Sequence, residues 1–106
     1  MNQGTADFVR VARVGDVARG RGTVVIAKGV RVALFHHGDG SYYALRNSCP
    51  HMGGPLGEGL LEGDVVTCPD HGWAFNVKTG RHVRAELVAV RTFPVKIDGD
   101  DIYVGV

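Results

Sequence analysis

Two short cysteine–histidine pairs contain the side chains of this chain that are best suited to metal chemistry. Cys49 and His51 are separated by one residue, and Cys68 and His71 by two, which gives the pattern C-x-H-x16-C-x2-H. The pairs use both cysteines of the sequence, and glycines follow each pair. Thiolates and imidazoles are common ligands of soft and borderline metals. We therefore predict a metal site formed by these four residues.

The mixture of ligands favours an iron–sulfur site. Thiolates are soft anionic donors that hold ferric iron, whereas neutral imidazoles favour a more reduced or borderline metal. If Cys49 and Cys68 bind one iron while the histidines bind another, two loops lying side by side can clamp a [2Fe–2S] cluster. The short spacing within each pair suits two neighbouring metals better than one chelated ion, although the spacing alone does not exclude the binding of a single metal ion.

The four residues allow three other interpretations. Two cysteines and two histidines can bind one structural zinc, but zinc fingers usually pair like ligands as C-x2-C and H-x3-H. A single disulfide would leave the histidines unexplained. A catalytic thiol beside a histidine needs one residue of each type, and this chain has two matched pairs. The iron–sulfur interpretation is therefore preferred, with the zinc module as the less favoured alternative.

Composition and charge limit the remaining possibilities. Apolar residues make up 44% of the chain and charged residues 22%, which is typical of a folded globular protein, and 106 residues suffice for one domain, predicted over 1–106. The formal net charge of +1 gives no reason to expect a nucleic-acid or membrane partner. The stretch 1–7 lacks the features of a signal peptide, and no apolar run is long enough to span a membrane. We therefore expect a cytoplasmic location.

The elements that must position the metal ligands are predicted to be strands. Short runs of β-branched and aromatic residues alternate with turns rich in glycine, aspartate and asparagine, which predicts an all-β fold with both metal pairs on loops. The first half should be a meander. Predicted strands cover residues 8–14, 23–27, 30–35, 42–45, 65–67, 73–77, 84–92, 95–97 and 102–106.

The two metal loops resemble a known family. The stretches CPHMGGPL at 49–56 and CPDHGWAFNVKTG at 68–80 are similar to the two-loop signature of Rieske [2Fe–2S] domains, and the flanks at 43–45 and 92–95 are similar too. The resemblance implies a Rieske fold of small antiparallel β-sheets with one [2Fe–2S] cluster at a two-loop tip. It also implies that the histidines coordinate through Nδ1 and form the exit for an electron. The implied ligands are Cys49, His51, Cys68 and His71.

Departures from the family pattern indicate a low reduction potential. Rieske subunits of quinol-oxidising complexes carry a disulfide at the positions of Gly54 and Asp70, and high-potential members place serine and tyrosine hydroxyls where Trp73 and Phe75 stand here. Without those hydroxyl donors to the cluster sulfurs, the reduced state is stabilised less. We expect a potential near the lower end of the Rieske range, which begins at roughly −150 mV.

Two soluble subfamilies match comparably. The stretch 60–66 is similar to the ferredoxins of multicomponent oxygenases, whereas 49–51, 71–73 and 90–95 are similar to the small subunit of NAD(P)H-dependent nitrite reductases. We favour a one-electron carrier between an NAD(P)H-linked flavin reductase and a terminal oxygenase, without substrate chemistry of its own. The alternative is the electron-transfer subunit that partners a nitrite reductase large subunit.

The remaining polar residues of note are predicted to be ordinary surface groups. Three histidines are expected on exposed turns, and three basic residues are expected to form a solvated patch. The histidines are His36, His37 and His82, and the basic residues are Lys78, Arg81 and Arg84.

Overall fold

The computed structural model describes residues 7–50, 53–70, 72–85 and 87–106. Within these ranges it contains ten strands and one short 3₁₀ helix, arranged as three antiparallel sheets. The predicted all-β class is confirmed. In the same ranges, no helix is long and apolar enough to cross a membrane.

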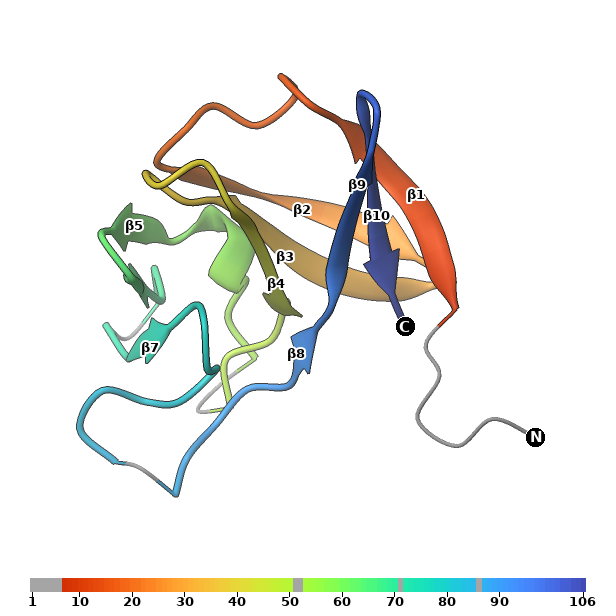
Figure 1. The fold of residues 1–106 in the computed structure, drawn as a ribbon. Coiled ribbons are helices and arrows are strands. Elements are labelled where there is room, and N and C mark those ends of the chain that lie inside the picture. The colour runs from red at the N-terminus through yellow and green to blue at the C-terminus, as the bar shows by residue number, and fades with distance from the viewer. Residues whose placement is uncertain (1–6, 51–52, 71, 86) are drawn as a thin grey trace.

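The ends of the chain form the first sheet, in the order β1-β10-β9. Strand β1 (Phe8–Arg13) pairs with β10 (Asp101–Gly105), which forms a hairpin with β9 (Val95–Asp98). This sheet lies on the right of Figure 1. The prediction of a meander through the first half was therefore wrong for the first strand, because its partner comes from the opposite end of the sequence.

The second sheet is the middle layer of the molecule (Figure 1). It contains β2 (Arg21–Ala27), β3 (Val30–His36), β4 (Tyr42–Arg46) and the short β8 (Thr92–Phe93), in that order. The β2–β3 turn is a two-residue turn in which both central residues have positive φ, 50° at Lys28 and 77° at Gly29, as in a type I′ hairpin.

Strand β3 is buried on both faces, which explains its unbroken apolar run. Ala33 and Phe35 belong to the core shared with the metal loops, whereas Val32 and Leu34 belong to the core shared with the first sheet. All four side chains are 0% exposed. The middle sheet thus separates two hydrophobic cores, and its Phe35 face supports the metal loops.

The third sheet carries the metal loops and is formed by β5 (Leu60–Glu62), β6 (Val65–Thr67) and β7 (Ala74–Asn76), preceded by the 3₁₀ helix η1 (Leu56–Glu58). Strand β5 and the helix were not predicted. The first metal loop leads from β4 to η1, and the second joins β6 to β7.

The predicted strand over 84–92 is wrong for most of its length. Regular pairing begins at Thr92, and upstream of it only Ala89 makes a bridge, to Arg81, among the described residues. Val88 and Val90 pack against the core, while Leu87 is 101% exposed. Alternating apolar residues therefore anchor an irregular loop here.

Candidate metal centre

The first metal loop is a single turn closed by two backbone hydrogen bonds. The amide of Cys49 donates to the carbonyl of Gly54 at 2.8 Å, and the amide of Gly53 donates to the carbonyl of Cys49 at 2.7 Å. Gly53 has a φ of 75°, in the left-handed region that favours glycine. The cysteine backbone is thereby held at the base of the turn.

The second loop repeats this scheme. The amide of Cys68 donates to the carbonyl of Trp73 at 2.7 Å, the amide of Gly72 donates to the carbonyl of Cys68 at 3.1 Å, and Gly72 has a φ of 74°. In each loop the predicted histidine ligand lies between the cysteine and this glycine in the sequence. His51 and His71 themselves lie outside the described residues, so their roles remain predictions.

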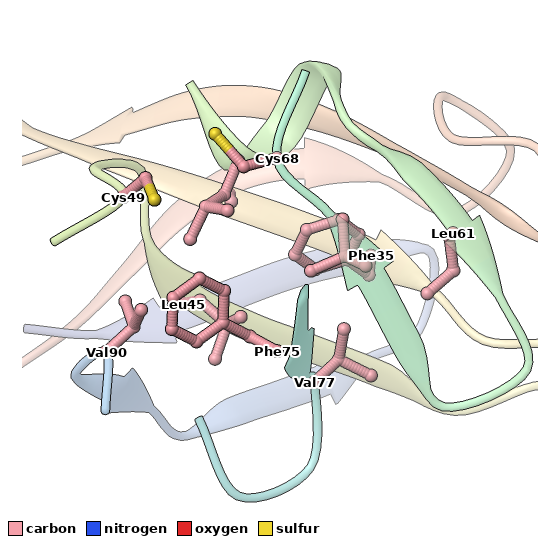
Figure 2. Packing of buried hydrophobic residues seen from close by; sticks show 11 residues of the cluster. Phe35, Leu45, Cys49, Leu61, Cys68, Phe75, Val77 and Val90 are labelled. Carbon is pink, nitrogen blue, oxygen red and sulfur yellow. The ribbon is translucent and has the colours of Figure 1, made fainter. Parts of the chain in front are cut away.

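The two thiols lie on the buried side of these loops. Cys49 and Cys68 are each 2% exposed and belong to the same hydrophobic cluster. Figure 2 shows them on two different loops at the same side of this cluster, with Leu45 and Phe75 nearby. An apolar wall therefore shields both sulfur atoms from water on the interior side.

The two loops meet across Gly54. A Cβ atom built on this glycine would lie 2.7 Å from Sγ of Cys68 and 2.8 Å from Oδ2 of Asp70. The backbone of the first loop is thus packed directly against side chains of the second. One soft thiol donor from each of two touching loops fits a [2Fe–2S] cluster held between them.

Ring contacts between three side chains support the second loop. Trp73 and Phe75 both contact the ring of His82 edge to face, with centroid distances of 5.1 and 5.2 Å. Nδ1 of His82 accepts hydrogen bonds from the amides of Arg84 and Ala85, at 3.0 and 3.2 Å. His82 is half-buried and organises the loop that follows β7, so the prediction of an exposed surface histidine was wrong.

Asn47 braces the first loop and was missed from the sequence. Its side chain is 8% exposed, and its Oδ1 accepts a buried hydrogen bond of 2.7 Å from the amide of Gly57. This bond ties the residue just before the loop to the helix just after it. No local sequence signal distinguishes such an asparagine from one in an exposed turn.

His37 joins the middle sheet to the third sheet. It is 9% exposed, and its Nε2 donates to Oδ1 of Asp64 at 2.5 Å, while its Nδ1 accepts from the amide of Asp39 at 3.0 Å. The hydrogen bond from His37, supported by the charge of Lys78, lowers the pKa of Asp64 below its ordinary value.

These contacts correct two further predictions. His37 is buried, and His36 bonds the carbonyl of Val17 through Nδ1 at 2.8 Å and stacks on Tyr42, so neither is a mere surface group. Lys78 is exposed, as predicted, and its Nζ lies 3.6 Å from Oδ1 of Asp64.

Comparison with known proteins decides the family. The model of the Rieske [2Fe–2S] domain matches residues 7–94. This chain belongs to the Rieske [2Fe–2S] domain family. The cofactor of this Rieske domain is accordingly a [2Fe–2S] cluster, which agrees with the paired thiol donors.

The relatives of this Rieske domain include ferredoxin components of oxygenase systems. The chain is 35% identical over 98 residues to the ferredoxin component of biphenyl 2,3-dioxygenase from Rhodococcus jostii RHA1, covering 92% of this chain and 91% of that protein. It is 32% identical over 104 residues to the ferredoxin component of an alkene monooxygenase system from Xanthobacter autotrophicus Py2, covering 97% and 84%.

Solved structures show the same fold. The ferredoxin of carbazole 1,9a-dioxygenase from Nocardioides aromaticivorans IC177 superimposes with a TM-score of 0.84 at 31% identity, covering 93% of this chain and 97% of that one. A putative NADH-dependent nitrite reductase small subunit from Mycobacterium tuberculosis has a TM-score of 0.84 at 28% identity, covering 94% and 96%. The predicted Rieske fold is confirmed.

Proposed function

We propose that this protein is a Rieske-type ferredoxin that carries single electrons from an NAD(P)H-linked flavin reductase to a terminal oxygenase. The observation that carries the proposal is the pair of touching loops, each with one buried thiol. The proposed ligands are Cys49, His51, Cys68 and His71. When bound, the cluster supplies reversible one-electron chemistry.

The residues of the chain hold the cluster and keep it near the surface. The thiols are buried against an apolar wall that includes Leu45 and Phe75, while the glycines of both loops form turns at the tip. Relatives of nearly the same length are named as ferredoxin components, which supports a small carrier without a substrate site.

A low potential fits this role. Phe75 is 0% exposed in the core and has no group that can donate a hydrogen bond, and Trp73 has no hydroxyl. Fewer hydroxyl donors to the cluster sulfurs place the potential near the lower end of the Rieske range, within reach of a nicotinamide-linked reductase. We further propose that residues 1–106 act as one Rieske domain in the cytoplasm, where thiols remain reduced.

The second candidate function is the small electron-transfer subunit of an NAD(P)H-dependent nitrite reductase. The observation that favours it is the likeness to the Mycobacterium tuberculosis protein, at a TM-score equal to that of the carbazole dioxygenase ferredoxin. The ferredoxin role is preferred because relatives with 31–35% identity are named as ferredoxin components of dioxygenases or monooxygenases.

The function is tested by loading, spectroscopy and turnover. The purified chain should contain two irons and should give, after dithionite reduction, the rhombic electron paramagnetic resonance signal of a histidine-ligated cluster. It should accept one electron from NADH through the reductase of a three-component dioxygenase and should deliver it to the matching oxygenase. A chain that binds one zinc and stays silent after cluster reconstitution would refute the proposal.

Ligand variants complete this test. Cys68→Ser and His71→Cys should abolish or convert the spectrum, whereas His36→Gln, which changes a histidine outside the metal loops, should leave it intact. An unchanged cluster in either ligand variant would disprove the proposed ligand set. Delivery of electrons to a nitrite reductase large subunit, and not to an oxygenase, would establish the second candidate.

A further inference from the structure

Three arginines line one open recess beside the first metal loop. Arg31 lies on β3, Arg46 ends β4, and Arg91 directly precedes β8. The recess encloses about 470 Å³, and its wall also includes Ser48 and Gly53. Ser48 directly precedes Cys49, and the amide of Gly53 donates to the carbonyl of Cys49. The positive charges are therefore placed at the rim of the predicted cluster tip.

The backbone holds the arginines together. The amide of Arg46 donates to the carbonyl of Arg91 at 2.9 Å, and the amide of Asn47 donates to the carbonyl of Arg31 at 3.1 Å. The guanidinium of Arg91 also lies over the ring of Phe93, 4.9 Å from its centroid. The sheet and its hydrogen bonds thus fix the backbone positions from which the three side chains enter the recess.

The charges of the recess are not balanced within the described part of the chain. All three arginines are exposed, none of them takes part in a described ion pair, and the lining contains no carboxylate. Some surface charges outside the recess are paired, such as Arg10 with Asp101 and Lys28 with Asp7. Three like charges in one recess repel one another, so folding stability does not account for them.

We propose that this arginine recess docks an acidic surface patch of the redox partner protein. The inference rests on the proposed electron-carrier function and adds the charge of the partner's docking face. Guanidinium groups pair with carboxylates in planar, two-pronged contacts, and they lose less on desolvation than ammonium groups. Redox interfaces are small and transient, and charge complementarity mainly speeds their formation. Carboxylates seated here would bring the partner directly beside the cluster.

The test uses two haem proteins of opposite charge as electron acceptors. The reduced, cluster-loaded protein is mixed in a stopped-flow instrument with acidic cytochrome b5 or with basic cytochrome c. Arg46→Glu reverses one charge of the recess, and Arg31→Gln is a milder second variant. Arg13→Glu is the matched control, because Arg13 is exposed at the end of β1 in the first sheet and makes no side-chain ion pair in the described ranges.

We expect slower electron transfer only in the recess variants and only to the acidic acceptor. At about 10 mM ionic strength, Arg46→Glu should slow transfer to cytochrome b5 about tenfold, as two charge units opposite one carboxylate about 5 Å away would produce in water. It should not slow transfer to cytochrome c, Arg31→Gln should show a smaller loss, and Arg13→Glu should change either rate less than about twofold. Raising the salt to about 0.5 M should shrink the difference.

Two outcomes would overturn the inference, and they are distinguishable from each other. Equal losses in Arg46→Glu and Arg13→Glu, or equal effects on both acceptors, would overturn the docking recess while leaving the carrier function intact. A wild-type protein without a [2Fe–2S] spectrum, or one that reduces neither acceptor, would overturn the carrier function and the docking inference with it.

Discussion

Replacing Asn47 by alanine should destabilise the first metal loop by more than the loss of one ordinary hydrogen bond. The substitution removes the acceptor of a buried 2.7 Å hydrogen bond from the amide of Gly57. Gly57 is closely packed, since a Cβ atom on it would lie 2.7 Å from the carbonyl oxygen of Thr23. Its amide would be left buried without a partner, which costs more than the bond itself contributes.

The size of the effect follows from the buried amide. A hydrogen bond contributes about 1 kcal/mol net, but a buried donor left without a partner costs about 1–3 kcal/mol, so we expect a loss of up to about 3 kcal/mol in the free energy of unfolding. For a domain of this length that corresponds to a fall in melting temperature of roughly 5–20 °C. Because Asn47 lies two residues before Cys49, the variant should also lose its cluster faster at temperatures below the transition.

The assay compares variants of the cluster-loaded protein at one scan rate, since cluster loss makes unfolding irreversible. Circular dichroism follows the fold, and visible absorbance follows the cluster. The matched control is Asn76→Ala, whose Oδ1 accepts from the amides of Lys78 and Thr79 at 2.8 and 3.3 Å in an exposed turn. Water can replace those bonds, so the control variant should lose less than about 1 kcal/mol in its free energy of unfolding. Equal shifts in the two variants would refute the reasoning from burial.

Two further predictions concern the contacts that hold the third sheet and its following loop. The hydrogen bond from His37, and then the charge of Lys78, lower the pKa of Asp64. The stabilisation that the ionised Asp64 contributes is therefore complete above about pH 4 and is lost as the pH falls through the pKa of the folded state. Asp64→Asn should therefore lower the melting temperature more at pH 6 than at pH 3; a difference independent of pH in circular dichroism would contradict this. Gly80→Ala should destabilise the protein by more than about 2 kcal/mol, because Gly80 has a φ of 77° and its Cβ would lie 2.2 Å from the carbonyl oxygen of Val90. A melting temperature within about 3 °C of wild type would show that the loop adapts.

Local patterns in the sequence were sufficient for most of the strands and for the two cysteine-containing loops. The hairpin of β9 and β10 was predicted within one or two residues, because a turn at Asp98–Asp100 separates two runs of apolar character. Cys49 and Cys68 were predicted as ligands from residue type and spacing, and the structure places both thiols in one buried cluster. The family signature also lies in those same short stretches.

Contacts between distant segments were beyond the reach of these patterns. Strand β1 pairs with β10 across nearly the whole sequence, and no local rule selects that partner. His37 looks like a turn residue beside glycines, but it is buried because Asp64 approaches it from another sheet. The apolar residues Leu87, Val88 and Val90 suggested a strand, yet Leu87 is exposed, and among the described residues of 84–91 only Ala89 makes a bridge.

The sequence by itself determined the all-β class and the candidate ligands: two thiols and two imidazoles in short pairs followed by glycines, a pattern that resembles the Rieske signature. The tertiary structure decided how the site is supported and what surrounds it. It brought Asn47 to Gly57, and it gathered Arg31, Arg46 and Arg91 around one recess. The physical reason is that metal ligation depends on a few donors close in sequence, whereas burial and the local electric field depend on which remote segments pack together.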